Sequence, residues 1–484
     1  MMNIKSLIKI TSVALLAVFL TACGSSNSGT AKDAISSFLG QNEHIIAFGN
    51  ADLKNVLFKA DYKNIPKLGK LLGTEFSTLE KVIDFNTPLY YAIEGPLDGN
   101  GNPSATYAFL TLKDNEKFIA ELTTRGFDVN KSGDLNYSED GDFAIGVKKN
   151  IAIVVVQNKE FDAEKLITAT FKKAESGLIG GKTDDILAQT GDFVLGMNVA
   201  SLYNTSNTEL GKLSADKQKS LKELVKDSFI QTVVKFEDGA AVIETKNYFS
   251  DELKSKMFFN NDKGAPVLAM LGKGNARAGL SVNIDMKKLQ ALMDEYSPET
   301  IDNLASSLGG PAQFVLATSG SNLSKLFSGK FGIVMLGDLG ANGSMIPAFN
   351  VFLGLEKQGR DLGELAAGMV PNVAESKVDG DGFKIYSSAE NASKSGGIKI
   401  PGGCDNFGKS GINAFVNLDG VNFDDFDLEG EANVIRVIKY ITFEYSNDGG
   451  RIYVKAKEGK ENILKQAMKV MVKELESEIN NMVI

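Results

Sequence analysis

Few side chains in this sequence are of the types that perform nucleophilic chemistry. The chain of 484 residues contains one histidine, His44, and two cysteines, Cys23 and Cys404. A nucleophilic serine or cysteine needs a neighbouring base, which is most often a histidine. His44 stands just before an apolar segment, and no Gly-x-Ser-x-Gly turn follows a predicted strand. The sequence therefore predicts no catalytic site built on an imidazole.

Oxygen ligands for a cation are more abundant. Asp98, Asn100 and Asn102 alternate as in a calcium loop, but Pro103 and Phe109 stand where that loop needs glycine and glutamate. A second acidic cluster has as its candidate ligands Asp424, Asp425, Asp427 and Glu429. Solvated turns explain both segments. We therefore predict no metal site and keep the second cluster as the remaining candidate.

Residues 177–183, "GLIGGKT", carry the Gly-Lys-Thr of a phosphate-binding P-loop. The spacing differs from that loop, because Ser176 occupies the position of its first glycine. A helix is predicted over 161–173, whereas the P-loop follows a strand. The pattern predicts a turn and no nucleotide site.

A pair of carboxylates can hydrolyse a glycosidic bond without histidine or metal. The 61 acidic residues offer no way to select such a pair. The absence of tryptophan counts against a stacked sugar platform. A carboxylate-dependent hydrolase remains an alternative without assigned residues.

The amino terminus has the parts of a secretory signal, with Lys5 and Lys9, an apolar stretch over 10–20 and small residues after it. The apolar stretch is shorter than the roughly 20 residues that span a bilayer. The segment 20–23, "LTAC", resembles the lipobox of bacterial lipoproteins. That resemblance implies cleavage before Cys23 and covalent lipid on its sulfur. We predict a signal peptide over 1–22, and lipidated Cys23 with a flexible tether over 23–32.

Lipidation of Cys23 leaves Cys404 as the sole thiol, so no internal disulfide is expected. Cys404 lies in the glycine-rich segment 396–411 and is predicted to be an incidental loop cysteine. One histidine and one thiol cannot supply a zinc site. The covalent lipid is the only prosthetic group that the sequence predicts.

The charge of the chain bears on its partners. Removing Lys5 and Lys9 with the signal peptide changes the formal net charge from −9 to −11. An acidic surface argues against nucleic acid as a partner, and export argues against nucleotides. The expected partners are the membrane, through the anchor, and other envelope proteins.

No later segment is apolar enough over a sufficient length to cross a membrane, so the remainder is expected to be soluble. Gly24 stands where many inner-membrane lipoproteins carry aspartate, and Lys32-Asp33 has only one acidic residue where surface lipoproteins cluster several. The outer membrane is therefore preferred. Its periplasmic and outward orientations both remain open.

An apolar run that ends in asparagine occurs four times, at Asn50, Asn198, Asn283 and Asn417. Each run is typical of a strand, and three of them precede a predicted helix start. The first and third are 233 residues apart, and the second and fourth 219. Segments with Asp-Gly turns at Asp140 and Asp379 recur in the same order. These offsets indicate an internal duplication.

We therefore predict an α+β protein with two tandem related halves, over 33–259 and 260–484. Hairpin signatures imply that each half is a mainly antiparallel sheet, and we expect helices packed on one face of each. The last helix, over 461–479, has one apolar stripe with helical period. We expect that stripe to cover the preceding hairpin.

The lipobox, the strand-plus-asparagine segments and the closing "KFEDGAAVIETK" hairpin with the helix start at Ser250 together resemble a family of Bacteroidota lipoproteins. That family is known only as a domain of unknown function, so the resemblance implies no activity. The sequence favours a non-enzymatic envelope protein, a tethered binding or scaffold module. A carrier of lipid or another apolar ligand in a curved sheet is the first alternative, and the hydrolase is the second.

Overall fold

The computed structural model describes residues 30–64, 68–157, 161–176, 180–204, 214–260, 267–296, 319–337, 348–369, 374–380, 382–392, 397–423 and 430–482. The chain forms two compact units. The first contains Met1–Lys212, Val225–Ile243 and Lys460–Ile484, and the second contains Leu213–Leu224 and Glu244–Gly459. Strand β10 (Ala240–Tyr248) begins in the first unit and ends in the second.

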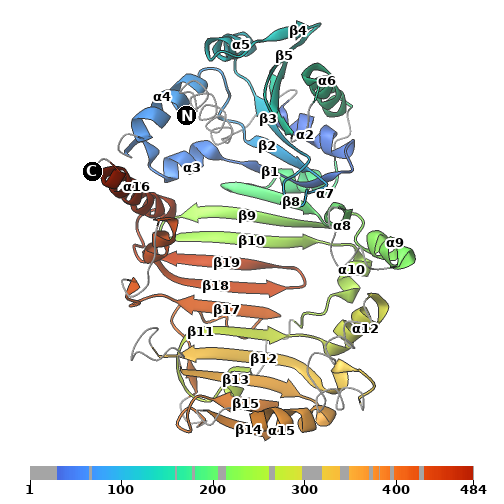
Figure 1. The fold of residues 1–484 in the computed structure, drawn as a ribbon, viewed down its shortest axis with the longest axis vertical. Coiled ribbons are helices and arrows are strands. Elements are labelled where there is room, and N and C mark those ends of the chain that lie inside the picture. Colours follow the sequence, from blue (N-terminus) through green and yellow to red (C-terminus); the bar gives the residue numbers. More distant parts are fainter. Residues whose placement is uncertain are drawn as a thin grey trace. The chain divides into compact units, whose positions relative to one another are not determined.

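The first unit is built on an antiparallel sheet. Its strands are β1 (Ile45–Ala51), β2 (Leu89–Glu94), β3 (Ala105–Thr111), β4 (Asn130–Ser132), β5 (Leu135–Asp140), β6 (Phe143–Lys148), β7 (Ile151–Gln157), β8 (Phe193–Asn198) and β9 (Phe229–Glu237). They pair in the order β9, β8, β1, β2, β3, β7, β6, β5 and β4 (Figure 1). Strand β1 therefore lies inside the sheet, between β2 and β8.

Helices cover both faces of this sheet. They are α2 (Ala31–Gly40), α3 (Leu53–Lys59), α4 (Leu68–Leu79), α5 (Asn115–Thr124), α6 (Ala163–Ala174), α7 (Lys182–Leu187), α8 (Val199–Asn204) and α16 (Ile463–Met482), with a 3₁₀ turn at Tyr62–Asn64. Phe109 of β3 packs on Phe38 of α2, with ring centroids 5.4 Å apart. The next residue, Leu110, belongs to a core cluster with Phe118 of α5. Because neighbouring residues of a strand point to opposite faces, α2 and α5 lie on opposite sides.

The prediction of helices on one face is therefore wrong for the first unit. The reason is visible in β6 and β7, where the apolar residues of "FAIGV" and "IAIVVV" run without alternation. A strand that is apolar on both sides needs cover on both sides. The Asp-Gly signatures correctly predicted the β5–β6 hairpin, which closes at Gly141.

Helix α16 returns to the first unit. It packs against α3 and β9, and Met468 and Val472 contact the core cluster that contains Leu53. At its start, Asn462 Nδ2 donates to the carbonyl of Phe236 at 3.1 Å, and Asn462 Oδ1 accepts from Leu464 N at 3.0 Å. The apolar stripe is a packing surface as predicted, but its partners come from the first unit.

The second unit also has an antiparallel sheet. Its main strands are β11 (Gly274–Asn283), β12 (Phe327–Leu336), β13 (Ala348–Leu355), β14 (Glu375–Asp379), β15 (Gly382–Tyr386), β17 (Ile412–Asn417), β18 (Ile438–Ser446) and β19 (Gly449–Ala456). They pair in the order β19, β18, β17, β11, β12, β13, β15 and β14 (Figure 1). The short strand β16 (Ile398–Lys399) pairs in parallel with the start of β11.

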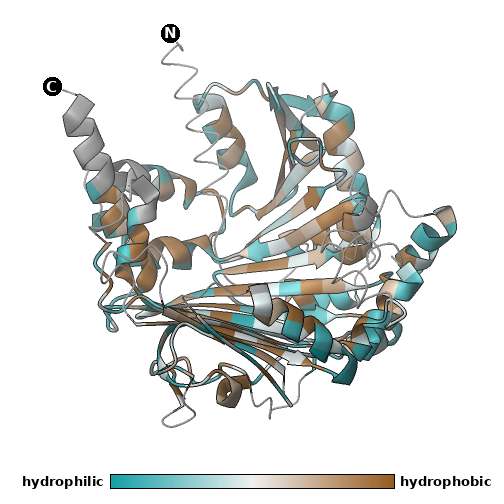
Figure 2. Ribbon diagram, turned by 60° about the horizontal axis from the view of Figure 1, so that its bottom comes forward, coloured by the Kyte–Doolittle hydropathy of each residue, from teal (hydrophilic) through white to brown (hydrophobic). Residues whose placement is uncertain are grey.

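The helices of the second unit are α9 (Ala215–Leu224), α10 (Asp251–Lys256), α11 (Val267–Met270), α12 (Met286–Tyr296) and α15 (Arg360–Met369), with 3₁₀ turns at Leu323–Lys325, Lys357–Gly359 and Gly430–Val437. Its core cluster joins Val267 and Leu271 to Val334, Phe352 and Phe415 of the sheet. Phe415 is buried. Hydrophobic residues recur along the strands (Figure 2).

The α+β class is confirmed. The strand-plus-asparagine segments do form strands, but asparagine caps only one of the three predicted helices. Asn198 Oδ1 accepts from Ser201 N in α8, whereas Asp52 caps α3 and Asp285 accepts from the first turn of α12. Among the described helices, none combines the length and apolar character needed to cross a membrane.

Candidate binding surface

Most of the residues singled out in the sequence do not form a site. Cys23, with the predicted signal and the start of the tether, lies outside the described residues, and so do Asp424, Asp425, Asp427 and Glu429. Across the described ranges, no three histidine, cysteine, aspartate or glutamate side chains are grouped as metal ligands. The sequence prediction of lipid on Cys23 therefore stays a prediction.

The Asp98 segment is a closed turn between β2 and β3. Asp98 Oδ1 accepts from the backbone N–H groups of Asn100 and Asn102, both at 2.8 Å, and its Oδ2 accepts from Asn102 Nδ2 at 2.9 Å. The Asn102 side chain and these backbone groups lower the pKa of the Asp98 carboxyl. Both carboxylate oxygens serve the turn, in agreement with the solvated-turn interpretation.

His44 and the P-loop-like segment have no shared chemistry. The His44 side chain is exposed directly before β1. Of residues 177–183, the structure describes 180–183, where Gly181 with φ 91° leads into α7. A positive φ suits glycine in a turn. In the described part of "GLIGGKT", Gly180 and Gly181 form the bend that precedes α7, and Lys182 and Thr183 lie in α7 itself.

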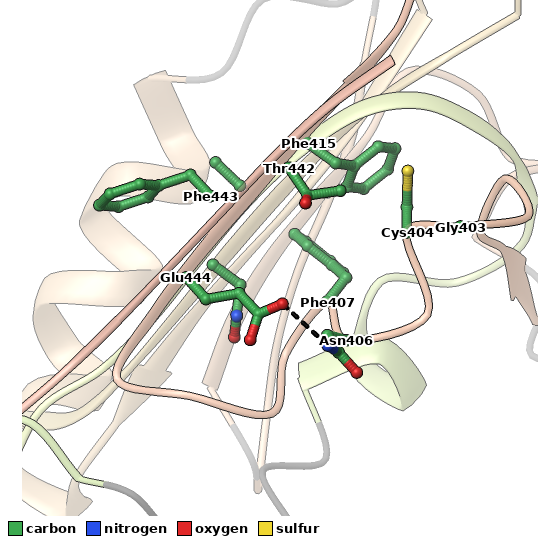
Figure 3. Close-up of a pocket in the computed structure, with 10 residues that line it drawn as sticks. Gly403, Cys404, Asn406, Phe407, Phe415, Thr442, Phe443 and Glu444 are labelled. Carbon is green, nitrogen blue, oxygen red and sulfur yellow. Dashed lines mark hydrogen bonds between the residues drawn. The ribbon is translucent and has the colours of Figure 1, made fainter. Parts of the chain in front are cut away.

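Cys404 is buried beside a small hollow in the second unit. Its neighbours there include Phe407, Phe415 and Thr442, and Asn406 Nδ2 donates to Glu444 Oε1 at 2.8 Å (Figure 3). The free space is about 10 Å³. That is near the minimum for one water molecule and far below the roughly 300 Å³ of a small-molecule site. This hollow therefore cannot hold an organic ligand.

Burial, with the charge of Asp405 as a second cause, raises the pKa of the Cys404 thiol to about 11. The thiolate is the reactive form, so only about 0.1% of the thiol is reactive at pH 8. In the mature chain carrying Cys23→Ser, we expect a disulfide reagent to modify Cys404 at least 100-fold more slowly than in urea. Thiol release measured by absorbance tests this, and equal rates in both conditions would contradict it.

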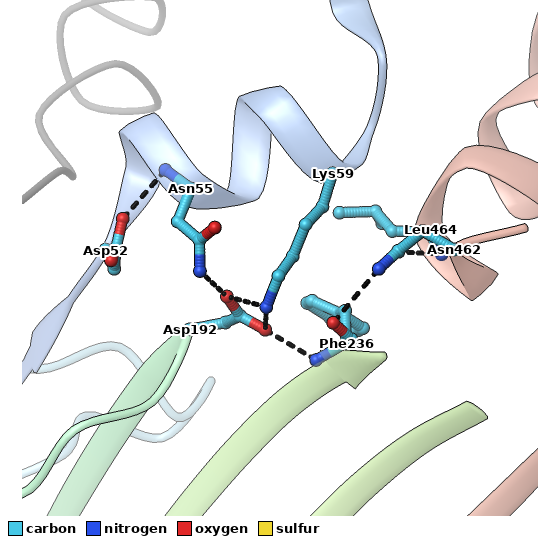
Figure 4. Close-up of polar contacts among 7 residues, drawn as sticks. All are labelled: Asp52, Asn55, Lys59, Asp192, Phe236, Asn462 and Leu464. Atoms are coloured by element: carbon cyan, nitrogen blue, oxygen red, sulfur yellow. Dashed lines mark hydrogen bonds and ion pairs between the residues drawn. The ribbon is translucent and has the colours of Figure 1, made fainter. Parts of the chain in front are cut away.

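A buried carboxylate in the first unit, Asp192, is fully engaged by its neighbours. Lys59 Nζ lies 2.7 Å from each of its oxygens, Asn55 Nδ2 donates to Oδ1 at 2.9 Å, and Phe236 N donates to Oδ2 at 2.5 Å (Figure 4). The Asp192 side chain has no exposed area. These contacts join α3, β8 and β9, so we assign the group a structural role.

The most unusual surface is one side of the second unit's sheet. Directly paired residues of an antiparallel ladder point to the same side, so register defines the side on which Leu280 lies. We call this side the apolar face. Its three rows across the strands are Val454, Ile441, Val416, Ala278, Met335 and Phe349; Ile452, Phe443, Ala414, Leu280, Ile333, Val351 and Ile385; and Gly450, Tyr445, Ile412, Val282, Phe331, Leu353 and Phe383.

The apolar face contains no charged and no amide side chain. Its only side-chain hydroxyl, on Tyr445, accepts from Asn247 Nδ2 at 3.1 Å. Leu280 and Val416, which lie on its central strands, are each 37% exposed. Such an extended apolar surface is atypical of a monomeric soluble protein.

The opposite side of the same sheet is covered, and it carries the core residues Val334, Phe352 and Phe415 together with polar side chains. Its central row contains Glu444, Asn413, Ser281, Gly332, Phe352 and Lys384. Asn413 and Lys384 are each 1% exposed. Lys384 Nζ forms an ion pair with Asp379 Oδ2 at 2.8 Å. Asn413 Nδ2 and Ser281 Oγ have no hydrogen-bond partner.

One side of the sheet is thus covered, with Asn413 and Lys384 buried beside the apolar core, while the apolar face on the other side is partly open. Folding alone does not favour leaving such a face open. None of the residues that could be singled out from the sequence points to this surface. Its signal is the alternation in segments such as 278–282 and 412–416, which sequence reasoning assigns to a core. Alternate residues of these strands point to opposite sides of the sheet, and only the structure shows which side is left partly open to solvent.

The comparisons with known proteins are limited. No protein-family profile and no curated protein matches this sequence. Among solved structures, crystal form III of TP0453 matches with a TM-score of 0.28 and 7% identity, covering 46% of this chain and 83% of that chain. Crystal form IV of TP0453 gives a TM-score of 0.27 and 10% identity, covering 44% and 79%. Similarity at this level assigns neither fold nor function.

Proposed function

We propose that this protein is a non-enzymatic binding module of the cell envelope, tethered to the membrane by lipid on Cys23. The lipobox-like segment 20–23 supports the anchor, and the absence of aspartate at Gly24 supports the outer membrane. The open apolar face supports a binding role, and its composition favours an apolar ligand. Neither nucleic acid nor nucleotide is expected as a partner, and the covalent lipid is the only attached group.

The observation that carries the proposal is the partly open apolar face of the second unit's sheet. Leaving Leu280 and Val416 partly in water costs free energy. A ligand that covers the apolar face removes this cost. The first alternative of the sequence analysis, an apolar carrier, therefore gains weight over a scaffold for envelope proteins.

We also propose that the chain arose by duplication of one α+β segment, as 33–259 and 260–484. The strand orders of the two units support this. In the first unit β8, β1, β2 and β3 are neighbours, and in the second unit β17, β11, β12 and β13 follow the same pattern. The inner strands β1 and β11 carry the repeated asparagines Asn50 and Asn283.

A neutral apolar fluorophore tests the binding role. In the mature chain with Cys23→Ser, we expect N-phenyl-1-naphthylamine to bind and to brighten. Combining Leu280→Lys with Val416→Lys should weaken binding at least 10-fold, because a charge cannot be buried under an apolar ligand without cost. The matched control is Val156→Lys, since Val156 of β7 is 39% exposed in the first unit.

Circular dichroism checks that each variant is folded, and threonine at both positions replaces lysine if the lysine variant is not. No binding by the natural sequence, or equal binding by all variants, would overturn an apolar ligand. If the probe fails while a cross-linked envelope protein is lost only from the Leu280/Val416 variant, the scaffold role replaces it.

A further inference from the structure

We infer that the apolar face binds one unbranched acyl chain, which lies along its two central strands, β11 and β17. The inference rests on the proposed binding of an apolar ligand and names the class of that ligand. It depends on the sizes of neighbouring side chains and on the lack of hydrogen-bonding groups among them, so it requires no particular head group.

Both alanines of the apolar face lie on its two central strands. We call the part of the apolar face that these strands form the central strip. Its residues are Ala278, Leu280 and Val282 of β11 and Ile412, Ala414 and Val416 of β17. Because alanine has no side-chain atom beyond Cβ, the surface is lowest at these two positions.

Longer side chains border the central strip on both sides. Strand β18 pairs with β17 and contributes Ile441, Phe443 and Tyr445, and β12 pairs with β11 and contributes Phe331, Ile333 and Met335. The rings of Phe443 and Tyr445 are stacked, with centroids 6.4 Å apart. The central strip is therefore a low path between two taller rows, and it runs along the strands.

The exposed side chains of the central strip lie beside its alanines. Leu280 pairs directly with Ala414, and Val416 pairs directly with Ala278. Among the described residues of the second unit, Leu280 and Val416 are the large apolar side chains that stay exposed. Each alanine leaves the flank of its longer partner uncovered. An apolar chain that fills the low positions would also cover these two flanks.

The dimensions of the central strip suit a single hydrocarbon chain. Two strands are about 10 Å wide, and three rows extend about 20 Å along them. The hydrocarbon of one bilayer leaflet is about 15 Å thick, so an acyl chain fits within this length. The area is about 200 Å², a quarter of the roughly 800 Å² that each partner contributes to a standard protein interface.

Composition also argues against a protein as the occupant. Protein interfaces carry about one hydrogen bond per 100–200 Å². The apolar face offers one side-chain hydroxyl, that of Tyr445, which is already bonded to Asn247. A surface without further donors or acceptors suits methylene groups, which need none.

Two neutral alcohols with the same 12 carbon atoms, 1-dodecanol and cyclododecanol, test the shape of the ligand. Binding to the mature chain with Cys23→Ser is measured by isothermal titration calorimetry, below the solubility limit of each alcohol. We expect 1-dodecanol to bind at least 10-fold more tightly. Its extended chain lies between the bordering side chains, whereas the wide ring rests on top of them.

Filling the central strip provides the stricter test. Ala278→Leu combined with Ala414→Leu makes the apolar face more apolar, yet we expect it to weaken 1-dodecanol binding at least 10-fold. A general apolar surface would bind equally or more tightly, because the hydrophobic effect is non-directional. The matched control is Val351→Leu with Val454→Leu, which adds apolar atoms on β13 and β19 and should leave binding unchanged.

Circular dichroism checks that the variants are folded, and valine at both alanine positions replaces leucine if the leucine variant is not. Equal binding of the two alcohols, or full 1-dodecanol binding by the filled variant, overturns the inference. So does a dimer in sedimentation analysis that Leu280→Lys with Val416→Lys dissociates, because a second copy would then cover the face. If N-phenyl-1-naphthylamine still binds in a Leu280-dependent and Val416-dependent manner, the proposed function stands without the acyl chain.

Discussion

Replacing Asp192 with alanine is expected to lower the free energy of unfolding of the first unit by about 3–5 kcal/mol. The substitution removes the acceptor of the Lys59 ammonium and of the Phe236 N–H at once. It also takes a partner from Asn55, which lies in α3 with Lys59. Removing one member of a buried ion pair leaves the other charge without compensation, and that accounts for the size of the effect.

Urea unfolding, followed by far-ultraviolet circular dichroism and assigned to the first unit by hydrogen exchange, measures this loss. The matched control is Asp114→Ala, which removes an exposed helix cap and the ion pair with Lys117. That control should cost about 0.5–2 kcal/mol. If Asp192→Ala costs no more than the control, the buried cluster has no special structural role.

Replacing Gly49 with alanine is expected to cost about 3 kcal/mol in the same measurement, at the upper end of the overpacking range. A Cβ at this position would lie 1.9 Å from the carbonyl oxygen of Val194 and 2.7 Å from Tyr91 Oη. Tyr91 Oη already donates to that oxygen at 2.9 Å. Because β1 lies between two strands, relief of this clash requires displacement of backbone.

Gly73→Ala provides a control of opposite sign. Gly73 lies in α4, and no atom lies within 4 Å of the Cβ that alanine would add. Alanine has the higher helix propensity, so this substitution should raise the free energy of unfolding by about 0.5–1 kcal/mol. An unfolding midpoint for Gly49→Ala that matches the natural sequence would contradict the close approach of β1 and β8.

The predictions made from local sequence patterns are confirmed where the backbone of neighbouring residues alone fixes the structure. Asp-Gly turns between alternating segments predicted the hairpins that close at Gly141 and after Asp379, since a two-residue turn brings its own strands together. The turn interpretation of Asp98 held for the same reason, because its acceptors are its own neighbours. The identity of helix caps was less predictable, since Asp52 and Asp285 compete with the nearby asparagines.

Predictions that depend on distant residues were less complete. The periodicity of α16 predicted its apolar stripe, but a stripe of this kind can pack against any apolar surface. Only the structure shows that Asn462 contacts β9 and that Met468 packs on the cluster containing Leu53 of α3. No sequence pattern indicates that Lys59, Asp192 and Phe236 are neighbours. Only the fold of the first unit brings them together. Covering of both faces of the first sheet was signalled by "IAIVVV", a run that by itself does not distinguish a strand from a buried helix.

The sequence by itself determined the α+β composition, the hairpins and the predicted lipid address at Cys23, because these depend on residues close together in the chain. The tertiary structure alone decided that both sides of the first sheet are covered and that one side of the second stays partly open. Alternation in a strand such as 412–416 separates two faces but does not say which of them meets other elements. In the second unit the covered side holds the core residues Val334, Phe352 and Phe415. The apolar face was left partly open, which is the basis of the binding role proposed for it.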